Sequence, residues 1–93
     1  MPKKTAQVSS EAIAQEVSGE TVILDLKSEQ YFSLDTVGTR VWQLLQGSSH
    51  IEEIYQQLLE EYEVEPSRLR TDLEDLLTAL EQEGLISLAE EVD

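Results

Sequence analysis

The sequence predicts an α+β fold, specifically a winged helix-turn-helix with an N-terminal three-stranded antiparallel sheet followed by three helices. Three observations lead to this prediction. Strand-like patterns are confined to residues 11–34, helical apolar periodicity is confined to residues 35–88, and a short turn separates the last two helical segments. Strands and helices that are segregated along the chain favour α+β over a parallel α/β sheet.

The chain, residues 1–93, is long enough for one domain with a single modest core. The sheet is assigned to residues 11–34 and the three-helix part to residues 35–88. Residues 1–10 are polar and without periodicity, so they are expected to be flexible, and residues 89–93 are expected to form a loose acidic tail.

Three short segments are predicted as strands. The pattern AIAQEV at residues 12–17 is weakly strand-like, whereas TVILDL at residues 21–26 is β-branched and aliphatic, as strands prefer. A polar turn then leads into the third strand, Gln30–Leu34. Neighbouring residues of a strand point to opposite faces, so one of Tyr31 and Phe32 is expected in the core and the other outside, without indication of which.

Capping signals delimit three helices. Asp35 is suited to the N-cap of the first helix, which is expected to end at Gly47 in the left-handed conformation. A capping box that starts at Ser49 opens the second helix, Pro66 is the first residue of the third, and Gly84 ends it. The short apolar tail that follows Gly84 is expected to dock as a fragment of strand.

The net charge of −14 is concentrated in the second half of the chain. Residues 1–50 contain six acidic and four basic residues, and residues 51–93 contain fourteen and two, which together account for the 20 acidic and 6 basic residues. A nucleic-acid partner is excluded because such binding depends on Lys and Arg at the phosphates. No apolar run reaches the ~20 residues of a membrane span, and neither a signal peptide nor a cysteine is present, so a cytoplasmic protein is expected.

The sequence offers little for catalysis. His50 is the only histidine, and it has no partner at metal-ligand spacing. Adjacent acidic pairs such as Glu52-Glu53 point about 100° apart on a helix, so they do not converge on one ion. No glycine-rich phosphate loop is present. We therefore expect no enzymatic activity, no cofactor and no metal.

An extended peptide is the ligand that the pattern favours. The strand Gln30–Leu34 has no obvious partner on its outer side, and such an edge can accept a peptide as an additional strand. Its residues are Gln30, Tyr31, Phe32, Ser33 and Leu34. The third helix supplies a stripe of five leucines as the opposite wall: Leu69, Leu73, Leu76, Leu77 and Leu80.

The leucine stripe also has a purely structural interpretation, in which the core takes it up entirely. That interpretation is favoured for Leu69, Leu73 and Leu76, and the alternative stays open for Leu77 and Leu80. The substitution Leu77→Asp is expected to abolish peptide binding while the helices stay intact.

Two stretches of this chain resemble a known family. They are DLKSEQYFSLDTVGTRVWQLL and VEPSRLRTDLEDLLTALEQEGLI, and the resemblance extends over residues 11–88. Their most specific marks are YFSL-D-x-x-G-x-R-x-W from Tyr31 to Trp42, Asp72 in the third helix, and the closing Gly84-Leu85-Ile86. This pattern is similar to the family of the pyrroloquinoline-quinone biosynthesis protein D, and within it to the stand-alone members of lasso-peptide gene clusters.

The resemblance implies a non-catalytic precursor-peptide recognition element. Members bind the leader of a ribosomally made precursor peptide and present it to a processing enzyme, which is a leader peptidase in lasso systems and a radical S-adenosylmethionine enzyme in quinone-cofactor systems. The leader adds beside the strand Gln30–Leu34 and packs against the third helix between Leu69 and Leu80. Asp72 is then positioned to meet basic leader residues.

Two alternatives stay open. The partner enzyme could be of the quinone-cofactor type, or the chain could be an acidic winged-helix interaction module that dimerises through its third helix. A monomer or a weak homodimer fits either reading. The acidic surface serves solubility or attracts a basic partner.

Overall fold

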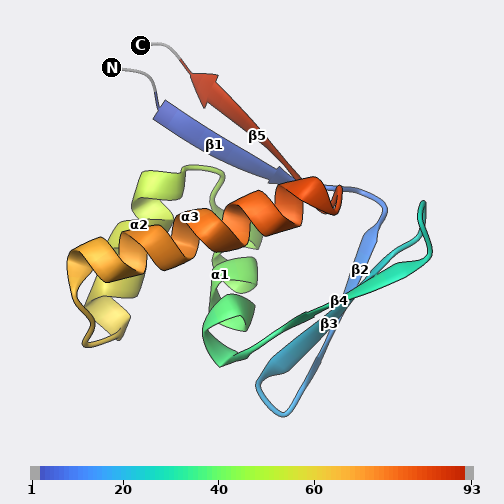
Figure 1. Ribbon diagram of the computed structural model, residues 1–93, viewed down its shortest axis with the longest axis horizontal. Coiled ribbons are helices and arrows are strands. Elements are labelled where there is room, and N and C mark those ends of the chain that lie inside the picture. Colours follow the sequence, from blue (N-terminus) through green and yellow to red (C-terminus); the bar gives the residue numbers. More distant parts are fainter. Residues whose placement is uncertain (1–2, 92–93) are drawn as a thin grey trace.

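A computed structural model describes residues 3–91 of the chain (Figure 1). The elements follow in the order β1 (Lys3–Val8), β2 (Ala12–Val17), β3 (Glu20–Asp25), β4 (Gln30–Leu34), α1 (Thr36–Gly47), α2 (Ile51–Glu61), α3 (Pro66–Gln82) and β5 (Ile86–Glu91). The fold is α+β, as predicted, with three helices after the predicted strands. None of the helices within residues 3–91 has the length and apolarity that a membrane crossing requires.

The predicted three-stranded sheet is present, with strand order β2-β3-β4 and antiparallel pairing throughout. A two-residue turn joins β2 to β3, and both of its residues, Ser18 and Gly19, have positive φ angles of 55° and 82°. Two positive φ values give the turn the twist that suits a tight hairpin. Asp25 holds the loop between β3 and β4, because its carboxylate accepts the backbone N–H of Lys27 at 3.1 Å and the Ser28 hydroxyl at 2.8 Å.

A second sheet joins the two ends of the described chain. β1 pairs antiparallel with β5 in a continuous register from Lys3↔Glu91 to Val8↔Ile86. The expectation of flexible residues 1–10 and a loose tail at 89–93 is therefore wrong for the part of each that the structure describes. Residues 1–2 and 92–93 lie outside the described residues. The apolar tail after Gly84 does form a strand, and it is longer than expected.

The helix signals are partly confirmed. Asp35 is the N-cap of α1, Pro66 is the first residue of α3, and Gly84 ends α3 with a φ of 75°. There the N–H of Gly84 donates to the Glu81 carbonyl and that of Leu85 to the Leu80 carbonyl, which is a Schellman motif.

Two capping predictions are wrong. Gly47 is the last helical residue of α1 rather than a left-handed residue beyond it, and the extended residue Ser48 caps the helix. The predicted capping box at Ser49 does not form, because His50 occupies the N-cap of α2 and its side chain does not cap the helix. The two signals flank or lie in the three-residue link between α1 and α2, where the N–H of Ala6 in β1 donates to the Ser49 carbonyl at 2.8 Å.

The core lies where the three helices meet both sheets. α1 packs against β3, α2 against β1, and α3 against α2 and β5. Sixteen buried apolar side chains form one cluster: Ala6, Ile23, Leu34, Val41, Trp42, Leu45, Ile51, Ile54, Tyr55, Leu58, Leu69, Leu73, Leu77, Leu80, Leu85 and Ile86. The β2-β3-β4 sheet extends to one side of this body, at the lower right of Figure 1.

Candidate functional site

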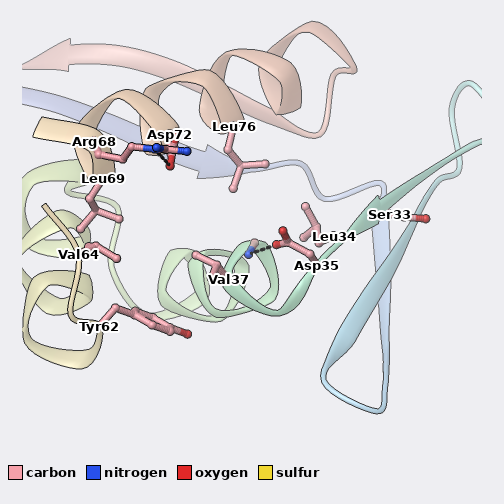
Figure 2. A pocket seen from close by; sticks show the side chains of 11 residues that line it. Ser33, Leu34, Asp35, Val37, Tyr62, Val64, Arg68, Leu69, Asp72 and Leu76 are labelled. Carbon is pink, nitrogen blue, oxygen red and sulfur yellow. Dashed lines mark hydrogen bonds and ion pairs between the residues drawn. The ribbon is translucent and has the colours of Figure 1, made fainter. Parts of the chain in front are cut away.

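A cleft lies between the end of β4, the start of α1 and the N-terminal half of α3 (Figure 2). Its volume is about 530 Å³, within the usual range for ligand sites. We call it the β4–α3 cleft. It is lined by Ser33, Leu34, Asp35, Val37, Gly38, Tyr62, Val64, Arg68, Leu69, Asp72 and Leu76.

The cleft has an apolar lining with charged groups at its rim. Leu34 and Leu69 are buried in its floor, whereas Val37 and Val64 are 41% and 44% exposed. Arg68 and Asp72 lie one turn apart on α3, with Arg68 Nε 3.7 Å from Asp72 Oδ2, and both side chains are largely exposed. Such a surface suits a ligand that is apolar at its centre and polar at its ends.

The backbone of β4 borders this cleft. In the three-stranded sheet, β4 pairs only with β3, so it is an edge strand. Alternate N–H and C=O groups of an edge strand point away from the sheet and have no partner within it. An extended chain laid along this edge would therefore find main-chain hydrogen bonds on one side and the apolar cleft on the other.

The D-x-x-G segment, residues 35–38, positions the start of α1 against the end of β4, where the two elements border the cleft. The Asp35 carboxylate accepts the Gly38 N–H at 2.8 Å, which caps α1 directly after the strand. A Cβ atom at position 38 would lie 3.2 Å from both Asp35 Oδ1 and Leu34 Cδ2. Glycine therefore permits the close approach of α1 to the end of β4.

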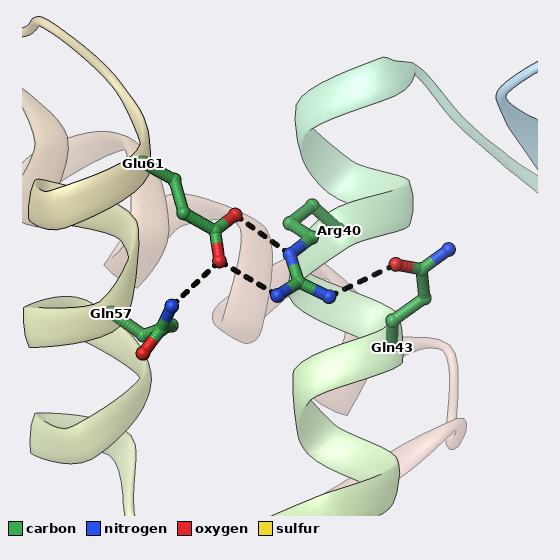
Figure 3. Close-up of polar contacts among 4 residues, drawn as sticks. All are labelled: Arg40, Gln43, Gln57 and Glu61. Atoms are coloured by element: carbon green, nitrogen blue, oxygen red, sulfur yellow. Dashed lines mark hydrogen bonds and ion pairs between the residues drawn. The ribbon is translucent and has the colours of Figure 1, made fainter.

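An ion pair next to the cleft joins α1 to α2 (Figure 3). Arg40 Nε and Nη2 donate to the two Glu61 carboxylate oxygens at 2.7 and 2.6 Å, and Gln57 donates to the same carboxylate at 2.8 Å. The hydrogen bond from Arg40 is the main reason why the pKa of Glu61 is lowered from 4.5 to about 2. Val37 and Gly38 on α1 and Tyr62 after α2 line the cleft within three residues of this pair, so the pair holds two walls of the cleft together.

Only some of the predicted site residues meet in this cleft. Ser33, Leu34, Leu69, Asp72 and Leu76 line it. Gln30, Tyr31 and Phe32 lie farther along the same strand and do not line it. Phe32 faces the core, partly buried, whereas Tyr31 is 71% exposed on the opposite face of the sheet. The question that the sequence left open is thereby answered: Phe32 is the inward residue.

The other three leucines of α3 lie away from the cleft. Leu73 and Leu77 are each 3% exposed and belong to the floor of a second hollow, on the side of α3 that faces α2 and β1. Leu80 is fully buried. The core interpretation holds for Leu69 and Leu73, which are buried, and is wrong for Leu76, which is only partly buried. Leu77 and Leu80, for which the sequence left the question open, are core residues. An Asp at position 77 would bury a carboxylate in the core, so this substitution tests folding rather than the cleft.

The sequence interpretation did not include six of the residues that line the cleft: Asp35, Val37, Gly38, Tyr62, Val64 and Arg68. Val37 follows the N-cap of α1 closely and is 41% exposed, whereas Val41 and Leu45 of the same helix are buried. Tyr62 and Val64 alternate in the link between α2 and α3, where apolar residues in an irregular segment were a signal that could have been used.

The titratable side chains of the described residues were also searched for a metal-binding arrangement. Within residues 3–91, no three His, Cys, Asp or Glu side chains lie close enough together to hold a metal ion. The cleft itself contains two carboxylates, and each already has a partner: Asp35 accepts from the α1 backbone and Asp72 lies beside Arg68.

The chain was compared with known proteins. Residues 20–86 match the family model described as coenzyme PQQ synthesis protein D (PqqD). No curated protein matches significantly. Two solved structures resemble the chain. One is described as TbiB1 in complex with the TbiA(β) leader peptide (34% identity, TM-score 0.82, 87% of this chain and 94% of that one). The other is a lasso peptide synthetase B1 complexed with the leader peptide (31% identity, TM-score 0.72, 89% and 98%).

Proposed function

This chain belongs to the PqqD family, and from that premise we propose that it captures the leader of a ribosomally made precursor peptide. It then presents the leader to a processing enzyme, which we take to be the leader peptidase of a lasso-peptide pathway. Both similar structures are leader-peptide complexes of about the same length as this chain, which supports the first step. The function is one of binding, without catalysis and without a cofactor.

The single observation that carries the proposal is the free edge of β4 beside an apolar cleft. The leader adds as a fourth strand along Gln30–Leu34, and this ladder of main-chain hydrogen bonds fixes its register. Because side chains of a strand alternate, every second leader residue then points toward the cleft. Leu69, Leu76 and Val37 are the apolar contacts we assign to those side chains.

The charged side chains at the rim of the cleft orient the bound leader. Asp72 and Arg68 form an exposed pair, and exposed pairs of this kind contribute little to stability. The pair can therefore open at low cost, so that Asp72 meets a basic leader residue. Leu73, Leu77 and Leu80 support the helix from inside the core and do not touch the leader.

We continue to interpret the helical part as a winged helix-turn-helix, in which α2 and α3 form the helix pair. Its acidic surface argues for a peptide rather than a nucleic acid as the ligand. A quinone-cofactor pathway, with a radical S-adenosylmethionine enzyme as partner, is the second candidate, favoured by the description of the family model. The similar structures favour the lasso pathway.

Binding of a fluorescent synthetic leader, taken from the precursor gene beside the gene for this chain, tests the proposal. Fluorescence anisotropy should give a dissociation constant between nanomolar and micromolar without added metal or cofactor. Leu76→Asp should weaken binding by about 10- to 100-fold, since it removes roughly 1.5–3 kcal/mol of apolar contact. Circular dichroism should show that this variant is folded.

Val17→Asp is the matched control, because it places the same charge on a 59% exposed valine of β2, away from the cleft. It should leave leader affinity within about twofold of the original protein. Equal affinities of the original protein and the folded Leu76→Asp variant would contradict the assignment of the cleft. Absence of binding to the original protein would contradict leader capture itself.

A further inference from the structure

The three-stranded sheet has an apolar face that points away from the helices. The register places Ile13, Leu24 and Tyr31 in one row across the sheet, and Val22 lies in the next row, between Gln15 and Ser33. We call this surface the outer face. Its apolar members are Ile13, Val17, Val22, Leu24, Leu26 and Tyr31. Five of these six are between 41% and 71% exposed, and Leu24 is half-buried.

The inner face of the same sheet is covered by the helices and combines apolar with polar side chains. Ile23 and Leu34 are buried there, and Phe32 packs against the core. There the buried hydroxyls of Thr21 and Thr39 form a hydrogen bond of 2.8 Å, and Gln43 of α1 donates to Glu16 at 2.8 Å. Asp25 is buried there as well. An antiparallel sheet with one covered face normally hides its apolar side and exposes its polar side. Here the uncovered face carries large apolar side chains as well, which leaves an apolar patch in water. Such a patch marks an interaction surface.

The charges around the outer face narrow the choice of partner. Exposed Glu11, Glu20 and Glu29 lie at the ends of the strands that carry the face, and Lys27 is the only base in residues 11–34. A two-fold contact between two copies would place the same acidic groups against each other. Anionic membrane surfaces would repel them in the same way. A different protein, with an apolar centre and Lys or Arg around it, is complementary.

The size of the outer face indicates a transient contact. Three strands about 4.8 Å apart and about 20 Å long cover roughly 300 Å². A stable complex buries about 800 Å² on each partner, and an obligate dimer more. The apolar patch thus suits a partner that associates, acts and leaves, with charge attraction assisting the encounter.

We propose that the outer face is the docking site of the processing enzyme, which carries an apolar patch bordered by basic residues. The identification of the partner as a processing enzyme rests on the proposed function. The geometry links the two sites through β4, because Tyr31 lies on the outer face while the edge of the same strand is free for the leader. An enzyme on the outer face therefore sits within about one strand spacing, ~4.8 Å, of a leader added to β4.

The double variant Ile13→Thr/Val17→Thr tests this proposal. Both residues lie on β2, the strand farthest from the leader edge, and threonine keeps the β-branched shape while it removes apolar surface. The probe is the purified leader peptidase encoded beside the gene for this chain, with binding measured by biolayer interferometry. The variant should bind the peptidase at least about tenfold more weakly and bind the synthetic leader within about twofold of the original protein.

Leu76→Asp is the reciprocal control: it should lose the leader and keep the peptidase. Leu26→Ser provides a second test if the double variant does not fold, because Leu26 lies in a loop, half-exposed, outside the strand ladder. Glu20→Lys should slow association and reduce its dependence on salt.

Three outcomes would overturn the docking proposal. One is equal peptidase affinity for the original protein and the folded face variants. Another is a dimer in light scattering that the double variant dissolves, since a second copy would then cover the face. The third is a peptidase that does not bind the original protein, with or without leader. In each of these cases, leader binding by the original protein would still support leader capture. Failure of the original protein to bind the leader, with peptidase binding intact, would contradict the proposed function and not the docking site.

Discussion

The two sides of α3 differ although both are built from leucine. On one side, Leu73, Leu77 and Leu80 are at most 3% exposed and lie in the core between α2 and β5. On the other, Leu76 is half-buried and lines the β4–α3 cleft together with Arg68 and Asp72. The leucine stripe thus divides into residues that hold the fold and residues that are available to a ligand. Leu69 has both roles, because it is buried in the core and also forms part of the cleft floor.

The largest expected effect is a loss of stability when a core leucine of α3 is shortened. Leu77→Ala or Leu80→Ala should lower the free energy of unfolding by about 2–5 kcal/mol, because each leaves a cavity in the core. Leu76→Ala should lower it by no more than about 1 kcal/mol, since part of that side chain is already in water. Urea denaturation measures all three variants. A cost at Leu76 as large as that at Leu77 would contradict the division.

The next effect concerns the cleft walls. Val37→Ser and Val64→Ser should each weaken leader binding by about three- to tenfold, because each side chain loses apolar contact in the complex. Their stability should change little, since both valines are more than 40% exposed in the free protein. Anisotropy titration measures the affinities. Val17→Ser, a similarly exposed valine of β2, is the control and should bind normally.

Acid should act on the ion pair that fixes the cleft walls. Glu61 has a pKa of about 2 in the folded protein, below its usual 4.5. Its contribution to stability is therefore complete above about pH 4.5 and is lost as the pH falls toward 2. Glu61→Gln should reduce the urea midpoint at pH 7 and remove this part of the acid dependence. Glu60→Gln, at an exposed neighbour without an ion pair among the described residues, should do neither.

The smallest expected effect is a loss of leader affinity when the charge of Asp72 at the cleft rim is removed. Asp72→Asn should weaken leader binding by about two- to threefold at 50 mM salt, because an exposed charge contact contributes less than about 1 kcal/mol. The difference should vanish near 1 M salt, where the screening length is about 3 Å. Asp75→Asn, on α3 but outside the cleft lining, is the matched control. A loss that persists at high salt would contradict an electrostatic role for Asp72.

Local signals predicted the parts of the fold that neighbouring residues control. Asp35, Pro66 and Gly84 mark helix ends through contacts within four residues, so the sequence alone identified them. The strand β1 and its pairing with β5 were missed because these residues pair across more than 75 positions, and β1 alone is short and mostly polar. The Ser49 capping box failed for a similar reason, since the link between α1 and α2 meets β1.

The candidate site was predicted in outline and corrected in detail. The free edge at Gln30–Leu34 follows from the order of the strands, which the sequence reveals through its turns. Predicting which leucines form the cleft wall required knowing how α3 is rotated about its own axis. Leu76 and Leu77 are neighbours that point about 100° apart, so a small error in rotation exchanges a cleft residue for a core residue.

The sequence by itself determined the α+β order, the family pattern and the strongly acidic charge. These properties depend on composition and on contacts between near neighbours. Only the tertiary structure decided which leucines line the cleft, that Phe32 faces inward, and that the uncovered face of the sheet carries exposed apolar side chains. A strand has two faces and a helix has a full circle of directions, and only packing against distant segments selects among them.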